Sequence, residues 1–329
     1  MNRTDKPKRD LYAEITGKLV AAIEADPGKP QMPWRKNPGA PLWVPVNAQT
    51  GKRYRGINVL SLWVAAEAQA FSSNIWATYK QFQELGAQVR KGEKSSLIVK
   101  YGEYEVEPNA DAEGDDGKRL YLRGYNVFNA TQVDGYSLPE APPPLPPVER
   151  IAVAEAFVAA TKAVIQYGGD RAYYRPATDQ IQLPDETSWT GTDSMTPAEA
   201  HAAVKCHELI HWTSHASRLN RELGKRFGDK AYCAEELVAE IGSALICAEL
   251  GITPDVRPDH AQYLALYLDL MKSDSKAIFT AAAAAARAVD YIKGLQPKEP
   301  EPDGPERPAG EDGATAEVVL SPSSRAGPA

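Results

Sequence analysis

The chain has 329 residues, of which 43% are hydrophobic and 25% are charged, a composition typical of a soluble globular protein. The length favours two domains, and the lack of an apolar leader or of a membrane-length apolar run predicts no membrane association. Three widely spaced cysteines exclude a disulfide framework and suit a reducing compartment, so we expect a cytoplasmic location.

The net charge of −7 conceals an asymmetry along the chain. Residues 1–100 carry 16 Lys and Arg against 8 Asp and Glu, whereas the remainder carries 21 against 36. The first part is therefore basic, at +8, and the remainder acidic, at −15. This asymmetry favours different partners for the two parts.

The N-terminal part is predicted to be an α+β domain that covers residues 8–136. Apolar residues at every fourth position indicate a helix, and a second apolar helix and a third one capped by Thr78 and stopped by Gly86 follow. A hairpin with a charged turn and a further strand come next. The helices are expected over 9–26, 57–71 and 78–86, the hairpin over 89–107 and the strand over 122–133.

A proline-rich segment divides the chain. Six prolines between positions 139 and 147 indicate an extended, semi-rigid linker, which we place at 137–148. At the other end, the stretch 296–329 is rich in Pro, Gly and acidic residues and is predicted to be a disordered tail.

The second domain, placed at 149–295, is predicted to be mostly helical with a small sheet. The second of its two strands, at 179–184, is expected to be an exposed edge that can pair with an extended peptide. With the first domain this gives an α+β protein of two domains. The helices are expected over 149–168, from 197 through 211, and over 231–251, 260–274 and 276–295, and the first strand over 171–176.

The segment HELIH at 207–211 is the sharpest chemical signal in the sequence. The chain holds only five His, so chance is a poor explanation for it. On a helix that Thr196 caps, His207 and His211 project from one face and can hold one Zn²⁺. Glu208 then lies beside the metal, where a general base for catalysis has to be.

The third metal ligand is expected from the later helix, which carries AEELVAE, because Ser217 stands where the longer metalloprotease pattern has a third His. Glu236 is the first choice as ligand, and Glu240 one turn on would accept a hydrogen bond from a ligand imidazole. Glu235 is the second choice as ligand. Tyr232, one turn before Glu236, is a catalytic candidate that could stabilise an oxyanion.

Simpler interpretations of these residues stay open. His207 and His211 could be hydrogen-bonded core residues, or they could bind a metal without peptidase activity. Tyr232 could be a plain core aromatic. His215 is expected to pack or to support a ligand, and His201 and His260 are expected to be ordinary surface or core residues.

Aromatic residues and cations alternate over residues 34–94. Cations neutralise phosphates and flat rings stack on unpaired bases, so this pattern indicates a surface for single-stranded DNA with little sequence preference. Burial of the aromatic residues in a core is the alternative. The candidate DNA-binding residues are Trp34, Arg35, Lys36, Arg53, Tyr54, Arg55, Trp76, Lys80, Arg90, Lys91 and Lys94.

Long stretches of the sequence also resemble a known family. DLYAEITGKLVAAIEA, TGKRYRGINVLSLW, QFQELGAQVRKGEKS and YNVFNATQV resemble the N-terminal domain of ArdC-type antirestriction proteins, which also occurs in plasmid-borne primases. HELIHWTSHASRLNR and AYCAEELVAEIGSALICAELGI resemble the zincin-like metallopeptidase domain of the same family. The resemblance implies a single-stranded-DNA-binding domain, a metallopeptidase-like domain and a role in protecting incoming plasmid DNA from restriction.

Carried over to this sequence, the resemblance implies that His207 and His211 are metal ligands and that Glu208 is the catalytic acid and base. We therefore expect an antirestriction-type protein with a zinc peptidase site and an unknown protein substrate. One alternative is a DNA-binding accessory protein whose metal site is catalytically silent. Another is a zinc peptidase whose basic domain recruits protein substrates.

Overall fold

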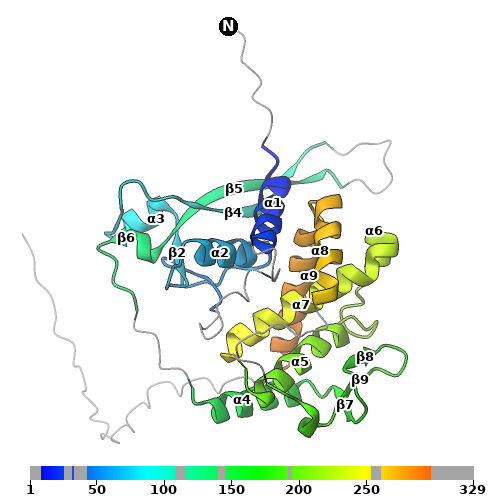
Figure 1. Ribbon diagram of the computed structural model, residues 1–329. Helices are drawn as coiled ribbons and strands as arrows, with labels where there is room; N and C mark the ends of the chain where they lie inside the picture. Colours follow the sequence, from blue (N-terminus) through cyan, green and yellow to red (C-terminus); the bar gives the residue numbers. More distant parts are fainter. Residues whose placement is uncertain are drawn as a thin grey trace, which may run out of the picture. The chain divides into compact units, whose positions relative to one another are not determined.

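The computed structural model describes residues 9–25, 32, 43–107, 116–139, 145–191, 195–252 and 261–297. Its N-terminal part combines helices with small sheets, and its C-terminal part is mostly helical with one small sheet (Figure 1). The predicted α+β class is therefore confirmed.

The helices of the N-terminal part lie where the sequence predicts them. Thr78 accepts a hydrogen bond from the amide of Gln81, whose side chain returns to the Thr78 amide, so the predicted cap is a complete capping box. Gly86, the predicted stop, has a φ of 75°, which glycine adopts without strain. The helices are α1 (Leu11–Glu24), α2 (Ile57–Ala68) and α3 (Tyr79–Glu84).

The strands of this part form two sheets, and one prediction about them is wrong. The segment 89–107 is not a hairpin, because its two ends pair with different partners. Val89 lies in β3, which pairs with β6, whereas β4 runs antiparallel to β5 over its full length and forms a long ribbon with it. The larger sheet has the order β1-β2-β5-β4. The strands are β1 (Val46–Asn47), β2 (Ile75–Ala77), β3 (Gln88–Val89), β4 (Ser96–Glu105), β5 (Lys118–Asn129) and β6 (Val133–Asp134).

Helix α2 covers the free edge of β4 at Leu97 and Val99, which lie at the base of the ribbon. The Asn58 side chain donates to the carbonyl of Val99 and accepts from its amide, both at 2.8 Å, and Ser61 donates to the carbonyl of Leu97. An uncovered strand edge invites pairing with another chain, so these side-chain contacts close it.

The C-terminal part departs from the sequence prediction at its first helix. The helix predicted over 149–168 ends at Ala160, because Lys162 has a φ of 58° and Val164 starts a strand. The remaining helices agree within a few residues. The elements are α4 (Pro147–Ala160), β7 (Val164–Tyr167), β8 (Tyr173–Arg175), β9 (Gln180–Leu183), α5 (Pro197–Trp212), α6 (Gly224–Phe227), α7 (Ala231–Leu250), α8 (Ala261–Ser273) and α9 (Ala277–Gly294), with the 3-10 turns η2 (Ala130–Gln132), η3 (Glu186–Ser188) and η4 (Gly228–Lys230).

The small sheet of this part corrects the prediction of the edge strand. β9, which lies within 179–184, pairs in parallel with β7 on one side and antiparallel with β8 on the other, so it is the central strand. Within the described residues the edges are therefore β7 and β8. The prediction is wrong because residues 164–167, which the sequence pattern places in the preceding helix, form the additional strand β7.

The two parts of the chain share one hydrophobic core and form one compact unit up to Gln296. The rings of Tyr12 on α1 and Phe279 on α9 lie 4.7 Å apart, and Thr16 donates a hydrogen bond to the carbonyl of Ser275 at 2.7 Å. The proline-rich segment thus separates the two parts in sequence without separating their cores.

Only the two ends of the predicted linker and the first two residues of the predicted tail are described. Residues 140–144 lie outside the described residues, and α4 already begins at Pro147. Of the predicted tail, only Gln296 and Pro297 are described. Within the described residues, no helix combines the length and apolar character that a membrane span requires.

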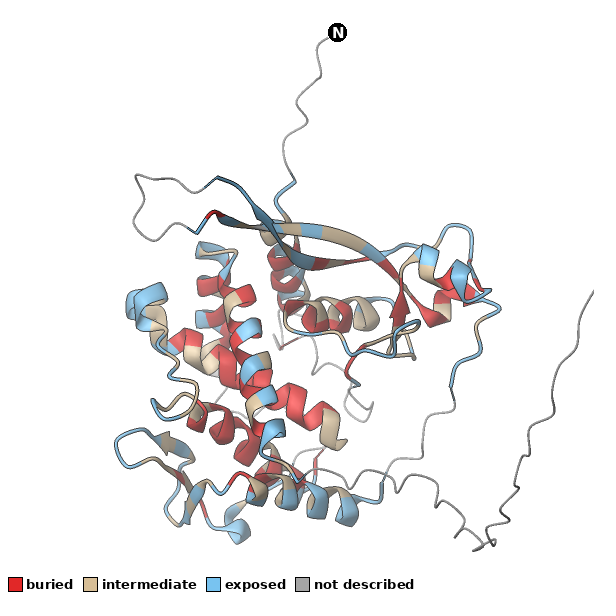
Figure 2. Cartoon of the chain, turned by 180° about the vertical axis from the view of Figure 1, so that it is seen from behind, coloured by how far each residue is buried: buried red, intermediate tan, exposed pale blue. Residues whose placement is uncertain are grey.

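Helices α5 and α7 form the most deeply buried layer of the molecule (Figure 2). Every residue of α7 from Leu237 to Ala248 is buried. Gly242 lets α7 come so close to α5 that a Cβ atom added to it would lie 2.6 Å from the Cδ1 atom of Ile210. This close packing fixes the distance between the two helices that carry the motif residues.

Replacing Gly242 by Ala should therefore lower the free energy of unfolding by about 1–3 kcal/mol, the usual cost of overpacking a core. Thermal melting followed by circular dichroism should show a lower Tm. Gly17 is the matched control, since nothing lies within 4 Å of a Cβ added there on the exposed side of α1. Ala at position 17 should stabilise the protein by about 0.5–1 kcal/mol. Equal effects at the two positions would contradict this packing account.

Candidate metal centre

Helix α5 begins at a capping box that the sequence predicts. The Thr196 hydroxyl accepts a hydrogen bond from the Glu199 amide at 3.3 Å, and the Glu199 carboxylate accepts one from the Thr196 amide at 3.0 Å. Pro197 occupies the first turn. The helix then runs without a break through His207 and His211, so both imidazoles project from the face that meets α7.

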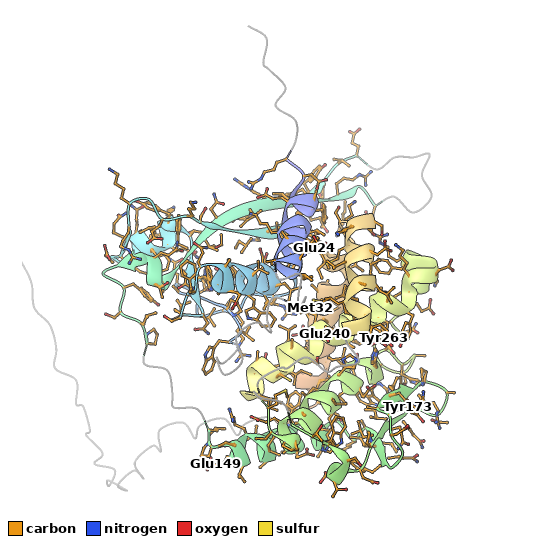
Figure 3. The ribbon with its side chains drawn as sticks, viewed as in Figure 1. Glu24, Met32, Glu149, Tyr173, Glu240 and Tyr263 are labelled. Carbon is orange, nitrogen blue, oxygen red and sulfur yellow. The ribbon has the colours of Figure 1, made fainter. Side chains whose placement is uncertain are left out.

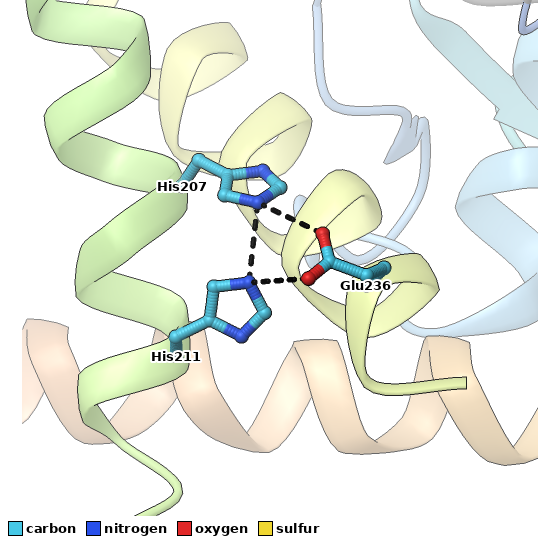
Figure 4. Close-up of side chains that lie close together, drawn as sticks. All are labelled: His207, His211 and Glu236. Carbon is cyan, nitrogen blue, oxygen red and sulfur yellow. Dashed lines mark hydrogen bonds and ion pairs between the residues drawn. The ribbon is translucent and has the colours of Figure 1, made fainter. Parts of the chain in front are cut away.

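Two imidazoles and one carboxylate converge between α5 and α7 (Figure 4). The Nε2 atoms of His207 and His211 lie 3.2 Å apart. The Glu236 carboxylate places one oxygen 3.5 Å from Nε2 of His207 and the other 3.6 Å from Nε2 of His211. The structure thus brings together the three predicted ligands.

This arrangement fits a divalent metal ion. A tetrahedral ion with bonds of about 2.0–2.1 Å to its ligands separates neighbouring ligand atoms by about 3.3–3.4 Å. The separation of the two Nε2 atoms, 3.2 Å, lies close to that value. Each Nε2 atom faces a different oxygen of Glu236, and one ligand atom from each of the three residues can be chosen within 4.8 Å of the others. Two imidazole nitrogens and a carboxylate are also a common donor set for zinc and related ions.

Glu235 has a role that the sequence assigned to another residue. Its carboxylate lies 3.2 Å from Nδ1 of His211 and is held by Arg221, whose Nε donates to it at 2.8 Å. Arg221 also donates to the carbonyl of Ile210 and to the hydroxyl of Thr213, both at 3.0 Å. Glu235 therefore contacts Nδ1 of His211 and does not face the Nε2 atoms, so Glu236 stays the first choice as third ligand.

The sequence held only a weak signal for this arrangement. Neighbouring glutamates on a helix point about 100° apart, so Glu235 and Glu236 cannot serve one face equally. The hydrogen bonds of Arg221 to Glu235 and Ile210 depend on the fold of the segment between α5 and α7. No spacing between motif residues in the sequence predicts them.

The carboxylates around the imidazoles make the site attractive to cations. Burial opposes the charged form of His211, but hydrogen bonds to Glu235 and Glu236 and the charge of Glu208 outweigh it and raise the pKa of His211 to about 10. Burial likewise acts against ionised Glu236, yet contacts with His207 and His211 hold its pKa well below the usual range. A bound cation would satisfy the same carboxylates.

Two further glutamates lie beside this cluster. Glu208 is buried, at 4% exposure, and faces the cavity in front of the cluster. Glu240 is buried on α7 one turn after Glu236 (Figure 3). Its predicted hydrogen bond to a ligand imidazole stays a prediction.

The cluster opens into a cavity of about 370 Å³. Tyr173 of the edge strand β8 and Tyr263 of α8 both line it (Figure 3), and Tyr232 of α7 is a further lining residue. The lining residues are Ala172, Tyr173, Tyr174, Pro176, His207, Glu208, His211, Ser214, Tyr232, Glu235, Glu236 and Tyr263.

Tyr232 is not a core aromatic, because 61% of the residue is exposed. Its hydroxyl lies 3.1 Å from the hydroxyl of Tyr263. Partial burial, the contact with Tyr263 and the charge of Glu236 all raise the pKa of Tyr232, so the phenol stays neutral and can donate a hydrogen bond into the cavity.

Two further histidines that the structure describes, His201 and His215, are not part of the cluster. His215 bonds through Nδ1 to the hydroxyl of Ser217 at 2.8 Å. His201 is buried beside Trp189, with ring centroids 5.3 Å apart, as expected of an ordinary core residue. His260 lies outside the described residues.

Among the candidate DNA-binding residues, Trp76 is a correction. It is 1% exposed and packs edge-on against Phe71 in a small core, so its ring is not accessible to a base. Tyr54 is partly buried, and its hydroxyl accepts a hydrogen bond from Asn47 at 3.0 Å. The remaining aromatic candidate and its two neighbours, Trp34, Arg35 and Lys36, lie outside the described residues.

The candidate cations divide into two groups. Arg53 and Arg55 form ion pairs with Glu249 and Asp290 of the C-terminal part. The other described cations are exposed on the N-terminal part and are Lys80, Arg90, Lys91 and Lys94. Of these, Lys80 and Arg90 form ion pairs with acidic neighbours. Two of these, Arg90 and Lys91, line a groove of about 680 Å³ together with Tyr79, Gln88, Val89, Glu93, Phe128 and Asp134.

Helix α5 carries HELIH and helix α7 carries Glu236, and both lie beside a small sheet. This combination defines a zincin-like metallopeptidase domain, which here packs against an α+β domain. Comparison with known proteins supports both assignments. Residues 152–284 match the family model described as zincin-like metallopeptidase, and residues 9–128 match the N-terminal domain of anti-restriction factor ArdC. The chain belongs to the ArdC antirestriction family.

Individual relatives agree with this membership. A crystal structure of the antirestriction protein ArdC from plasmid R388, free of metal, has 39% identity and a TM-score of 0.70 and covers 87% of this chain and 98% of its own. A Mn(II)-bound structure of the same protein gives a TM-score of 0.69. The protein y4eC of Sinorhizobium fredii is 43% identical over 90% of this chain and 95% of its own length.

Two DNA primases TraC of Escherichia coli also match, each with 37% identity over 89% of this chain. The chain spans only 28% and 20% of their lengths. The ArdC-like region is therefore one part of those longer proteins.

The geometry predicts a graded loss of metal affinity when Glu235, Glu236 or Glu240 of α7 is replaced. Glu236→Ala should weaken binding of Zn²⁺ or Mn²⁺ most, because Glu236 carries the oxygens that face both imidazoles. Glu235→Gln should weaken it about 10- to 100-fold, the usual effect of removing a group that orients a ligand histidine. Isothermal titration calorimetry can measure both changes. A larger loss in Glu235→Ala or Glu240→Ala than in Glu236→Ala would require a different third ligand.

Proposed function

We propose that this antirestriction protein binds single-stranded DNA through its N-terminal part and cleaves a protein substrate at a metal site in its C-terminal part. The convergence of His207, His211 and Glu236 carries the peptidase half of the proposal. The Mn(II)-bound structure of the related ArdC supports the binding of a divalent ion, and these three residues are the described group that could hold one. We propose Zn²⁺, since its preferred ligands match the set.

The residues around the cluster have complementary roles in peptide hydrolysis. His207, His211 and Glu236 would hold a divalent ion, which would supply Lewis acidity toward a peptide carbonyl and a water molecule. Glu208, buried at the cavity, takes a proton from that water and passes it to the leaving amine. Tyr232 donates a hydrogen bond where negative charge develops on the carbonyl oxygen. Glu235 and Arg221 keep His211 in place throughout.

The N-terminal half of the proposal depends on charge and on the relatives. The first hundred residues have a charge of +8, and phosphates attract such a surface. The same region occurs in proteins named DNA primases, whose templates are nucleic acids. A protein that protects incoming DNA from restriction acts where restriction occurs, so its cytoplasmic location follows from the proposal.

The variant Glu208→Gln should keep the metal and lose peptidase activity, because Glu208 acts as a base and is not a ligand. We expect a fall in kcat of at least about a hundredfold, the lower end of what general acid-base catalysis contributes. Fluorescently labelled unfolded casein with added Zn²⁺ provides the assay, and atomic absorption reports the bound metal.

Two results would change this proposal. Loss of metal from Glu208→Gln would make Glu208 a ligand. If the wild-type protein binds metal but cleaves neither casein nor its own chain, the catalytically silent alternative is favoured. His207→Ala combined with His211→Ala serves as the control that removes metal and activity together.

The wild-type chain should bind single-stranded DNA more tightly than duplex DNA of equal length, because stacking requires unpaired bases. Affinity should fall steeply as salt rises, with a slope of about −0.7 for each neutralised phosphate. Fluorescence anisotropy with a labelled oligonucleotide measures both quantities. The full chain is required, since the two parts share one core. Absence of salt-dependent binding would favour the plain peptidase whose basic part recruits proteins.

A further inference from the structure

The two faces of the β4–β5 ribbon differ in chemistry. Directly opposed residues of an antiparallel pair point to the same face, and successive residues alternate between faces. One face carries Val99 opposite Gly124 and Tyr101 opposite Leu122. This inner face meets α1: a Cβ added to Gly124 would lie 3.1 Å from Leu11, and Tyr101 shares a hydrogen bond with Tyr12.

The outer face of the ribbon combines tyrosines with cations. Along this face the register places Ile98 opposite Tyr125, Lys100 opposite Arg123, Gly102 opposite Tyr121, and Tyr104 opposite Arg119. The two acidic residues of these strands, Glu103 and Glu105, lie on the inner face. Lys118 lies on the same face and forms an ion pair with Glu103 at 3.4 Å. The outer face therefore carries three cations and no acid.

The outer face is accessible beyond the base of the ribbon. Tyr104 is 50% exposed and Tyr121 is 46% exposed, and Lys100 and Arg123 are also exposed. In Figures 1 and 2 the distal part of the ribbon extends past α2, in agreement with these exposures. Within the described residues, no acidic side chain forms an ion pair with Lys100 or Arg123.

The Tyr121 ring lies over β4 because glycine stands opposite it. A Cβ atom at Gly102 would come within 2.2 Å of the Tyr121 ring, so the ring rests directly on the β4 backbone. The Tyr104 ring follows with its centroid 6.1 Å away and a tilt of 46°. Further along, the Arg123 guanidinium lies 5.5 Å from the Tyr125 ring. Two exposed rings, those of Tyr104 and Tyr121, therefore lie next to the positive charges of this face.

We propose that the outer face of the β4–β5 ribbon binds an unpaired nucleic-acid strand. Bases stack on Tyr104 and Tyr121, and Lys100, Arg119 and Arg123 neutralise the adjacent phosphates. Flat aromatic faces beside a cationic track are what single-strand binding requires, since every base has a face that can stack. The inference deepens the proposed DNA binding and places it outside residues 34–94, where the sequence pattern located it.

The test uses the full-length protein and a fluorescein-labelled oligothymidylate of about 20 nucleotides, with anisotropy as the readout. Tyr104→Ala and Tyr121→Ala should each weaken binding by between about 5-fold and 150-fold, the range of one stacked base. Lys100→Ala and Arg123→Ala should each weaken binding and reduce the slope of log affinity against log salt by about 0.7. Tyr121→Phe should bind within about twofold of wild type, because it keeps the ring.

The inner face of the same ribbon offers matched controls. Tyr101 is 48% exposed and Lys118 is exposed, so each resembles its outer-face counterpart in residue type and in exposure. Tyr101→Ala and Lys118→Ala should leave DNA affinity within about twofold of wild type. Gly102→Ala should lower the affinity as Tyr121→Ala does, since the added methyl displaces the Tyr121 ring. Thermal melting checks that each variant is folded.

The outcomes separate this inference from the function on which it rests. Wild-type protein that does not bind the oligonucleotide overturns the proposed DNA binding and this site with it. Wild-type binding that the four outer-face alanine variants leave unchanged, or that the inner-face variants reduce equally, overturns the ribbon site alone. Equal losses for duplex and single-stranded DNA would show that the ribbon binds backbone without stacking, which also overturns it.

Discussion

The close packing of α5 against α7 is the constraint on which the rest of the structure depends. Gly242 permits an approach that brings His207 and His211 on one helix within reach of Glu236 on the other. Interaction among these groups is strong because they are largely removed from water, and a carboxylate beside two imidazoles favours a positive charge between them. A displacement of the helices by the width of a methyl group would alter both distances between the imidazoles and the Glu236 carboxylate.

A second layer of contacts keeps the cluster in register. Arg221 joins the end of α5 to the start of α7 by donating both to the Ile210 carbonyl and to Glu235, which in turn holds His211. The same two helices also pack against α9, which meets α1 and α2 of the N-terminal part within one core. The metal cluster and the ribbon thus belong to one compact unit, so a change in the core affects both.

The two proposed activities occupy chemically opposite surfaces. The cavity is lined by carboxylates and tyrosines, which suits a cation and a polypeptide, whereas the outer face of the ribbon has cations and tyrosines, which suit phosphates and bases. The two surfaces thus favour ligands of different chemistry, a cation in the cavity and a polyanion on the ribbon. DNA binding and proteolysis can therefore coexist on one molecule.

The sequence by itself determined what depends on local spacing. The i, i+4 separation placed His207 and His211 on one helical face, the Thr196 box started that helix, and the spacing within AEELVAE singled out Glu236. Tertiary structure alone decided which strand pairs with which, and so it made β9 central and gave the ribbon two unlike faces. It also buried Trp76 and set Glu235 against His211. Local spacing follows from the fixed geometry of a helix, whereas strand partners and burial depend on contacts between residues distant in the chain, which no short pattern encodes.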